Sequence, residues 1–197
     1  MLFSSFEFLF RFLPVFLVIY YLTPKKLRNV TLLGGSIVFY TIGEAGYITI
    51  LLACVLVNYT LTRLMYRKNT DGRGIRQKRL LLLALGYDLG VLFFFKYSGL
   101  ASGLPLGISF YTFQIMAYVI DVYRGRIPAE QSLLRLGTYL TMFPQLISGP
   151  ITNYADVRVA LGRERTIKAR QLEEGMKLLI IGLAAKVVIA DRSGTRW

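Results

Sequence analysis

Histidine is absent from the 197 residues of this chain, and cysteine occurs only once, at Cys54. Without histidine, the chain lacks the usual general base for chemistry near neutral pH and the commonest nitrogen ligand of metals. A single cysteine cannot form an intrachain disulfide, so it gives no information about the redox compartment. Because neither histidine nor a second cysteine accompanies Cys54, the sequence predicts no metal site.

Nucleotide-binding fingerprints are missing as well. The chain contains no Walker-type GxxxxGK(S/T) motif, which would cradle phosphates in a glycine-rich loop. Its LGISF string at 106–110 lacks the glycine spacing of a dinucleotide-binding turn. We therefore expect no cofactor.

Acidic residues are scarce, with 11 Asp and Glu against 24 Lys and Arg, and the net charge is +13. The basic residues gather in loops beside apolar runs, notably at 24–29 and 63–79, where the positive-inside rule and anionic headgroups favour them. Binding to nucleic acid would need basic residues interleaved with exposed aromatics, but here the aromatics lie inside the apolar runs. The pattern predicts membrane lipid, and no nucleic acid, as a partner.

Long apolar runs are what the chain has in abundance. Hydrophobic residues make up 54% of it and its mean hydropathy is +0.50, which places it in the membrane class. We expect about five to seven membrane spans, in an all-α, polytopic transmembrane helix bundle that forms a single domain over 1–197. The apolar runs are 6–22, 30–41, 47–64, 80–95, 104–123, 133–151 and 175–190.

Two of these runs have special features. The first, 6–22, has no basic region before it and no small-residue cleavage site after it, so we expect it to remain attached rather than be removed as a signal peptide. The second, 30–41, is short and contains Gly34 and Gly35. It is predicted to be either a packed half-helix or one arm of a tilted hairpin.

The basic loops predict an orientation. Placing 24–29 and 63–79 in the cytoplasm puts Met1 and the connection at 43–46, which has no Lys or Arg, on the outer side. The fifth apolar run then returns to the cytoplasm. We expect a multi-pass membrane protein.

The run 133–151 breaks this alternation. The stretch that follows it, 154–174, is basic and also favours the cytoplasm, so the run must begin and end on the same side. Pro144 and the pair Gly149-Pro150 interrupt any regular helix within it. The two observations together predict a re-entrant, broken segment.

A polar seam is predicted within the run 104–123. Tyr111, Gln114, Tyr118 and Asp121 recur at helical spacing, so they fall along one stripe of a helix. Polar groups are costly to bury in lipid without partners, and a lipid-facing anchor does not need them. The seam is therefore either a polar substrate path or a set of contacts between helices. For Asp121, an ion pair with a nearby arginine at the membrane boundary is the favoured interpretation.

The broken segment offers further candidates. Its interrupted backbone leaves amides and carbonyls unpaired, which is tolerated at membrane depth only against water, ligand or protein. Gln145, Ser148, Gly149 and Pro150 are therefore candidates to line a substrate path. The alternative is a bend that merely shapes the bundle.

Asp88 is a carboxylate in the middle of the run 80–95. Burial can turn such a group into a general base. The favoured alternative is a buried partner for a Lys, Arg or Tyr on another helix, because intramembrane carboxylates commonly pair.

Several strings occur in an order that resembles a known family. They are PKKLRN at 24–29, FFFKYS at 93–98, GISFYTFQ at 107–114, DVYRG at 121–125 and FPQLISGP at 143–150. With the opening apolar run, they resemble the membrane-bound O-acyltransferases, in the branch typified by the bacterial alginate O-acetyltransferase. The resemblance extends over essentially the whole chain, and it implies a multi-pass protein of the bacterial inner membrane.

The resemblance implies a function and a set of partners. The full enzyme would take an acyl group, usually acetyl, from a thioester donor or an acidic carrier protein on the cytoplasmic side. It would pass the group towards a cell-surface polysaccharide such as alginate, through a partner acyltransferase on the outer face.

The resemblance also implies that this is the N-terminal portion of such an enzyme. The catalytic histidine of the family lies in a C-terminal half that is not present in this sequence, so no catalytic residue is assigned. We expect the chain alone to transfer no acyl group, and whether it counts as an enzyme is left open. The alternatives are D-alanyl transfer to teichoic acid by a related branch, and a non-enzymatic transport or scaffold protein.

Overall fold

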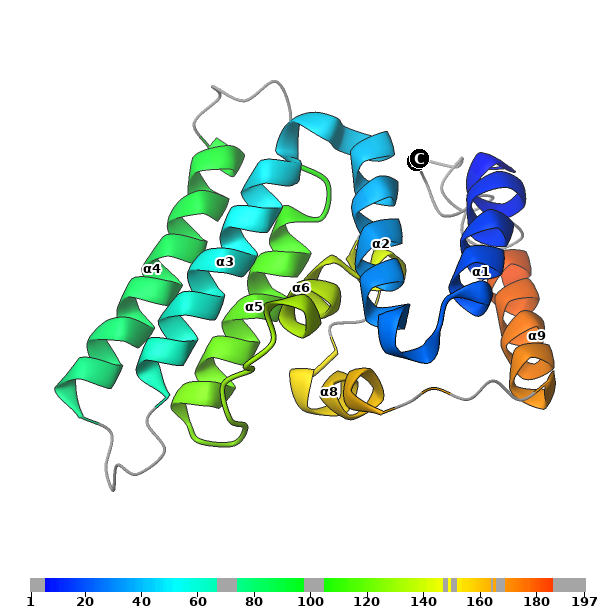
Figure 1. The fold of residues 1–197 in the computed structure, drawn as a ribbon. Helices are drawn as coiled ribbons and strands as arrows, with labels where there is room; N and C mark the ends of the chain where they lie inside the picture. The colour runs from blue at the N-terminus through cyan, green and yellow to red at the C-terminus, as the bar shows by residue number, and fades with distance from the viewer. Residues whose placement is uncertain are drawn as a thin grey trace.

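The computed structural model describes residues 6–66, 74–97, 105–146, 149, 152–163, 165 and 169–185, and the regular structure within these residues is entirely helical. The prediction of an all-α fold is confirmed for this part of the chain. The elements, labelled in Figure 1 where there is room, are η1 (Phe8–Phe12), α1 (Leu13–Leu22), η2 (Lys25–Leu27), α2 (Arg28–Glu44), η3 (Ala45–Tyr47), α3 (Ile48–Met65), α4 (Ile75–Tyr97), α5 (Ile108–Tyr123), α6 (Leu133–Thr141), α7 (Phe143–Leu146), α8 (Tyr154–Gly162) and α9 (Ala169–Ala185).

Two helices in the described part of the chain, α3 and α4, are long and apolar enough to cross a membrane. At 1.5 Å per residue they measure about 27 and 35 Å, close to the thickness of the hydrocarbon core. Many of their apolar side chains point away from the protein, and Leu82, Leu83 and Phe93 of α4 are all more than half exposed. Such side chains have a favourable environment in lipid.

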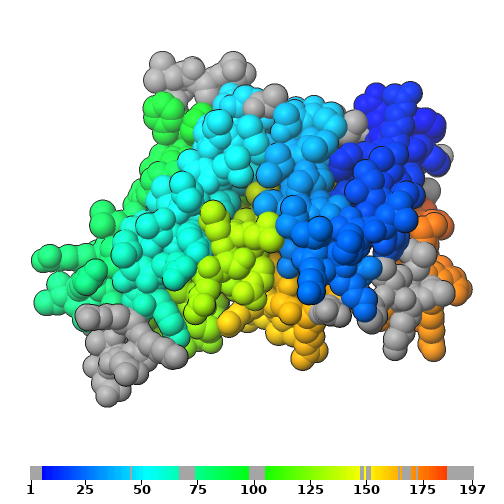
Figure 2. All heavy atoms as spheres, viewed as in Figure 1, coloured from blue at the N-terminus to red at the C-terminus, as the bar shows by residue number. Residues whose placement is uncertain are grey.

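The helices α3, α4 and α5 stand side by side, and α2 continues the row towards α1 and α9 (Figure 1). The basic η2, the end of α3, the start of α4 and the end of α5 all lie at the lower edge of this view, and η3 lies at the upper edge. The segments predicted to be cytoplasmic are therefore gathered at one end of the molecule. In the space-filling view, α6 reaches the surface between α3 and α2, with α8 below it (Figure 2).

The main core surrounds α5. Leu51 of α3, Ile115 and Val119 of α5 and Leu136 of α6 are completely buried and belong to one apolar cluster. Burial of this kind fixes which face of α5 turns inward, and the same face carries the polar seam.

A second, aromatic cluster joins α1 to α2 and α7. Phe16 and Phe143 make an edge-to-face contact with ring centroids 5.1 Å apart, and Phe39 and Phe8 complete the cluster. Gly35 lets α2 approach α1, because a Cβ at this position would overlap the Phe16 ring. Of the two alternatives for 30–41, the half-helix is wrong, since the run lies within α2, a helix of 17 residues.

The region after α5 is built from short helices. Ser132 caps α6, accepting a hydrogen bond from the amide of Arg135 at 3.4 Å, as N-cap residues do. The helix ends at Thr141, and Pro144 lies in the first turn of α7, where its missing N–H costs little. The break predicted from Pro144 thus falls between α6 and α7.

Candidate functional site

The polar seam of α5 turns towards the interior of the protein for most of its length. Tyr111, Gln114 and Tyr118 are between 1% and 3% exposed. Asp121 lies nearer the end of the helix, and its carboxylate forms a 3.2 Å ion pair with the exposed Arg126. This is the boundary ion pair that the sequence favoured for Asp121.

Gln114 connects α5 to the broken segment. Its side-chain amide donates to the backbone carbonyl of Tyr139 at 3.3 Å and to Gln145 Oε1 at 3.4 Å. The same oxygen of Gln145 accepts a hydrogen bond from the Thr152 hydroxyl at 3.0 Å. Two predicted site residues, Gln114 and Gln145, are thus brought into contact.

Thr152 and Tyr154, which follow the broken segment, pack against Tyr139 of α6. The Tyr139 hydroxyl donates to the carbonyl of Thr152 at 2.8 Å. The rings of Tyr139 and Tyr154 meet edge to face, with centroids 4.9 Å apart. The residues on either side of the break therefore lie next to each other.

Gly149 allows the chain to turn tightly. Its amide donates to the carbonyl of Gln145 at 3.2 Å. A Cβ at this position would lie 2.5 Å from the Cα of Gln145, so a larger residue would force the backbone apart. Ser148 and Pro150, which were predicted beside it, lie outside the described residues.

A second glycine sets the approach of α5 to α7. Gly107 has φ +75°, a left-handed conformation that residues with a Cβ rarely adopt, and its missing side chain leaves room for the carbonyl oxygen of Leu146. The start of the polar seam is therefore packed directly against the end of α7.

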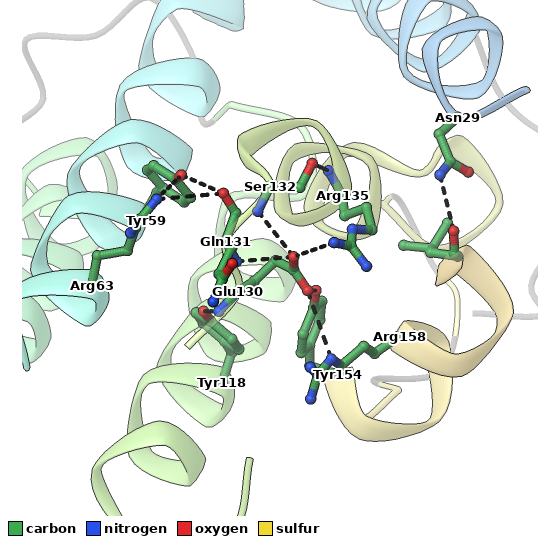
Figure 3. Close-up of polar contacts among 11 residues, drawn as sticks. Asn29, Tyr59, Arg63, Tyr118, Glu130, Gln131, Ser132, Arg135, Tyr154 and Arg158 are labelled. Atoms are coloured by element: carbon green, nitrogen blue, oxygen red, sulfur yellow. Dashed lines mark hydrogen bonds and ion pairs between the residues drawn. The ribbon is translucent and has the colours of Figure 1, made fainter. Parts of the chain in front are cut away.

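Glu130, which sequence reasoning missed, has more hydrogen-bond and ion-pair partners than any other described residue in this region. Its side chain is 2% exposed. The carboxylate accepts hydrogen bonds from the amides of Gln131 and Ser132, both at 2.9 Å, and the Glu130 amide donates to the Tyr118 hydroxyl at 2.9 Å (Figure 3). Glu130 therefore ties the polar seam to the start of α6.

Three further side chains converge on the same carboxylate. Arg135 of α6 lies 3.1 Å from Oε1, and Arg158 of α8 lies 3.7 Å from Oε2. The Tyr154 hydroxyl donates to Oε2 at 2.6 Å (Figure 3). Burial and the adjacent carboxylate raise the pKa of Tyr154 above its usual range, so the phenol stays protonated and remains a donor. We call Tyr118, Glu130, Arg135, Tyr154 and Arg158 the Glu130 cluster.

Positive charge surrounds the Glu130 cluster. A cavity of 330 Å³ beside it is lined by Arg135 and Arg158, and a neighbouring one of 470 Å³ by the same two residues with Arg126 and Arg163. These four arginines outnumber the two carboxylates that pair with them, Glu130 and Asp121. The arrangement can therefore attract an anionic group to this end of the molecule.

Asp88 lies apart from this region, between α3 and α4. It is 1% exposed, and its Oδ1 accepts hydrogen bonds from Asn58 Nδ2 at 2.7 Å and from Cys54 Sγ at 3.5 Å. The prediction that Asp88 pairs with a Lys, Arg or Tyr is wrong, because its hydrogen-bond partners among the described residues are an amide and a thiol. Within the described residues, three buried oxygens have no hydrogen-bond partner: Asp88 Oδ2, Asn58 Oδ1 and Tyr111 Oη.

No group of three or more His, Cys, Asp or Glu residues that could hold a metal ion occurs in the described part of the chain. The site instead supplies hydrogen-bond donors, buried hydroxyls and guanidinium groups. Such groups bind and orient polar or anionic ligands.

Comparisons with known proteins give one consistent result. No protein-family model and no solved structure matches the chain. Over 97% of its length it is 35% identical to probable alginate O-acetylases of Pseudomonas putida and Pseudomonas aeruginosa, of which it covers 43% and 40%. It is also 27% identical, over 98% of its length, to a peptidoglycan O-acetyltransferase of Helicobacter pylori, of which it covers 45%.

These similarities confirm the resemblance to the alginate O-acetyltransferase branch. They run through every described helix, because nearly the whole chain is aligned. The chain spans about two fifths of the length of the alginate relatives that it matches.

Proposed function

We propose that this chain, a homologue of the alginate O-acetylases, forms the N-terminal part of a membrane-bound O-acetyltransferase that acts on a cell-surface polysaccharide. The observation that carries the proposal is the 35% identity over 97% of the chain. Because the chain spans about two fifths of those relatives, the remaining part of such an enzyme would supply the catalytic base.

In this proposal the protein is multi-pass, and its basic end faces the cytoplasm. Support comes from the common location of η2, the start of α4, the end of α5 and α8 at one end of the molecule. The segment 133–151 is a re-entrant loop. The hydrogen bond between Glu130 and Tyr154, which flank the segment, supports this, because a simple span would carry its two ends to opposite faces.

The seam has two roles in the proposal. Gln114 and Tyr118 hold helices together, since the side-chain nitrogen of Gln114 and the hydroxyl of Tyr118 are hydrogen-bonded to protein groups. Tyr111 lines a polar path across the bundle together with the broken segment at Gln145 and Gly149. The Tyr111 hydroxyl supports this role, because it is buried without a partner among the described residues and can therefore bind water or substrate.

Partners follow from charge and orientation. The basic end attracts an anionic thioester donor or an acidic carrier protein in the cytoplasm. The acyl group leaves on the outer face, where a second acyltransferase passes it to the polymer. Alginate is the first candidate acceptor, and the similarity to the Helicobacter pylori protein makes peptidoglycan the second.

A chimera tests the proposal. This chain replaces the matching part of the Pseudomonas putida relative, in a strain from which the gene for that relative has been deleted. The chimera should restore acetylation of the polysaccharide, and the 197-residue chain expressed alone should not. Acetylation by the isolated chain would refute the assignment of catalysis to the remaining part.

A further inference from the structure

A small basic cavity lies where the beginning of α2 meets the end of α8. Its volume is 160 Å³, room for about five water molecules at the ~30 Å³ that each occupies in the liquid. Its lining includes no carboxylate from the described residues. Five of its eight lining residues carry positive charge: Lys25, Lys26, Arg28, Arg163 and Arg165.

Two of these cations are held in place by neutral groups. Arg28 is 9% exposed, and its guanidinium donates to the backbone carbonyls of Thr23 and Arg165. The Arg165 guanidinium donates to oxygens at 2.6–3.1 Å that belong to Asn29, Tyr20 and Ala160. These hydrogen bonds orient both side chains without neutralising either charge.

A hydrogen bond between α2 and α8 holds the two sides of the cavity together. The amide of Asn29 donates to the Leu161 carbonyl at 3.0 Å, which joins the first turn of α2 to the last turn of α8 (Figure 3). The loop before α2 and the loop after α8 are far apart in sequence, and this contact brings their cations together. The cavity is therefore built by the tertiary fold and is not a chance run of basic residues.

The arginines of this cavity differ from those of the Glu130 cluster in their hydrogen-bond acceptors. There, Arg135 and Arg158 share a buried carboxylate. Here Arg28 and Arg165 donate, among the described residues, to carbonyl, amide and phenol oxygens. Clustered charges are normally compensated by a counter-charge, and no carboxylate lies among the described residues that line this cavity, so their cations give it a positive potential.

The chemistry of the lining selects among anions. Guanidinium groups match the geometry of phosphate oxygens, and lysines add point charges.

We propose that this cavity is a binding site for a phosphate group, carried by either a lipid headgroup or a soluble phosphate compound. The site does not depend on the acetyltransferase proposal, because none of its residues belongs to the polar seam; it shares only Arg163 with the 470 Å³ cavity near the Glu130 cluster. Its position at the basic end of the molecule makes both sources reachable.

The test uses the complete chain in micelles of an uncharged detergent, titrated with inorganic pyrophosphate in a calorimeter. The variant Lys26→Gln with Arg163→Gln removes two exposed lining charges and spares the hydrogen bonds that join α2 to α8. The control Arg76→Gln with Lys78→Gln removes two exposed charges at the start of α4. Circular dichroism checks that both variants fold.

Pyrophosphate binding should weaken at least tenfold in the first variant and less than twofold in the control. The charge-retaining pair Lys26→Arg with Arg163→Lys should bind within about threefold of the unmodified chain. Equal weakening in both glutamine variants, or no measurable binding by the unmodified chain, would overturn the proposal.

A second measurement identifies the source of the phosphate. The chain is placed in nanodiscs with or without phosphatidylglycerol, and bound pyrophosphate is measured in each. If phosphatidylglycerol displaces pyrophosphate from the unmodified chain, and has no such effect on the Lys26→Gln with Arg163→Gln variant, the site binds a lipid headgroup. Retention assigns it to a soluble phosphate compound.

Discussion

The Tyr154 hydroxyl donates a 2.6 Å hydrogen bond to the Glu130 carboxylate, across 24 positions of sequence. The residues between them make up α6, α7 and the returning chain. This one contact therefore holds the two ends of the segment together. Leu146, within the segment, lies against Gly107 at the start of α5. Arg135 and Arg158 reinforce the closure from α6 and α8.

Replacing Glu130 tests how much this closure stabilises the fold. Glu130→Gln removes the charge that compensates Arg135 and Arg158, and we expect it to lower the free energy of unfolding by about 2 kcal/mol. Fully buried pairs lose about 3–5 kcal/mol when one partner is removed, but these arginine side chains are 35% and 37% exposed, so solvent screens part of the effect.

The matched control for this substitution is Glu173→Gln on α9, which breaks an exposed ion pair with Lys177. It should cost less than about 0.5 kcal/mol. Denaturation in mixed micelles, followed by circular dichroism, measures both variants. Equal losses would contradict a stabilising role for the Glu130 cluster.

Replacing two glycines that have similar backbone angles distinguishes the cost of a left-handed conformation from the cost of a steric clash. Gly107 and Gly125 have φ of 75° and 71°, but only at Gly107 would a Cβ meet another residue, the carbonyl of Leu146. Gly125→Ala should cost about 1 kcal/mol from its left-handed conformation alone. Gly107→Ala should cost at least about twice as much, because α5 and α7 must also separate. Thermal unfolding of the two variants compares them, and equal costs would exclude the close packing of α5 on α7.

Removing the buried hydroxyls of Tyr111 and Tyr118 in α5 should change the free energy of unfolding by different amounts. Tyr118→Phe loses the hydrogen bond from the Glu130 amide and should cost about 1 kcal/mol of stability. Tyr111→Phe removes a hydroxyl that has no partner among the described residues, so stability should stay within about 0.5 kcal/mol or rise.

Acetylation by the chimera then assigns a role to Tyr111. If its hydroxyl lines the acyl path, Tyr111→Phe should reduce acetylation although the protein remains stable. Full acetylation by this variant would leave Tyr111 as a packing residue only.

Cysteine labelling tests the proposed topology. Arg76→Cys and Arg163→Cys should both react with a membrane-impermeant maleimide only from the cytoplasmic side, and Gly46→Cys only from the outer side. The native Cys54 is buried and should contribute little background. Labelling of positions 76 and 163 from opposite faces would rule out a re-entrant segment over 133–151.

Sequence reasoning located the helices well where apolar runs are continuous. The run 47–64 corresponds to α3 almost residue for residue, because composition alone marks a helix of this length. The start of α4 was misplaced by five residues, since Arg76 and Lys78 extend the helix beyond the apolar run. Helical hydrogen bonding does not depend on hydrophobicity, so charged ends are easily missed.

The partners of buried polar residues could not be predicted. Glu130 lies in a polar connection, and its contacts come from α5, α6 and α8, which no local spacing brings together. Asp88 was recognised as a buried carboxylate, but its partners on α3 depend on how two helices pack. Tertiary contacts of this kind become visible only when the helices are placed in space.

The acetyl content of the polymer made by the chimera, measured by proton NMR, tests the central claim most directly. The account predicts acetyl groups on the alginate of cells that carry the chimera, and none in cells that carry either part separately. An unacetylated polymer from cells in which the chimera is present in the membrane in normal amounts would contradict it.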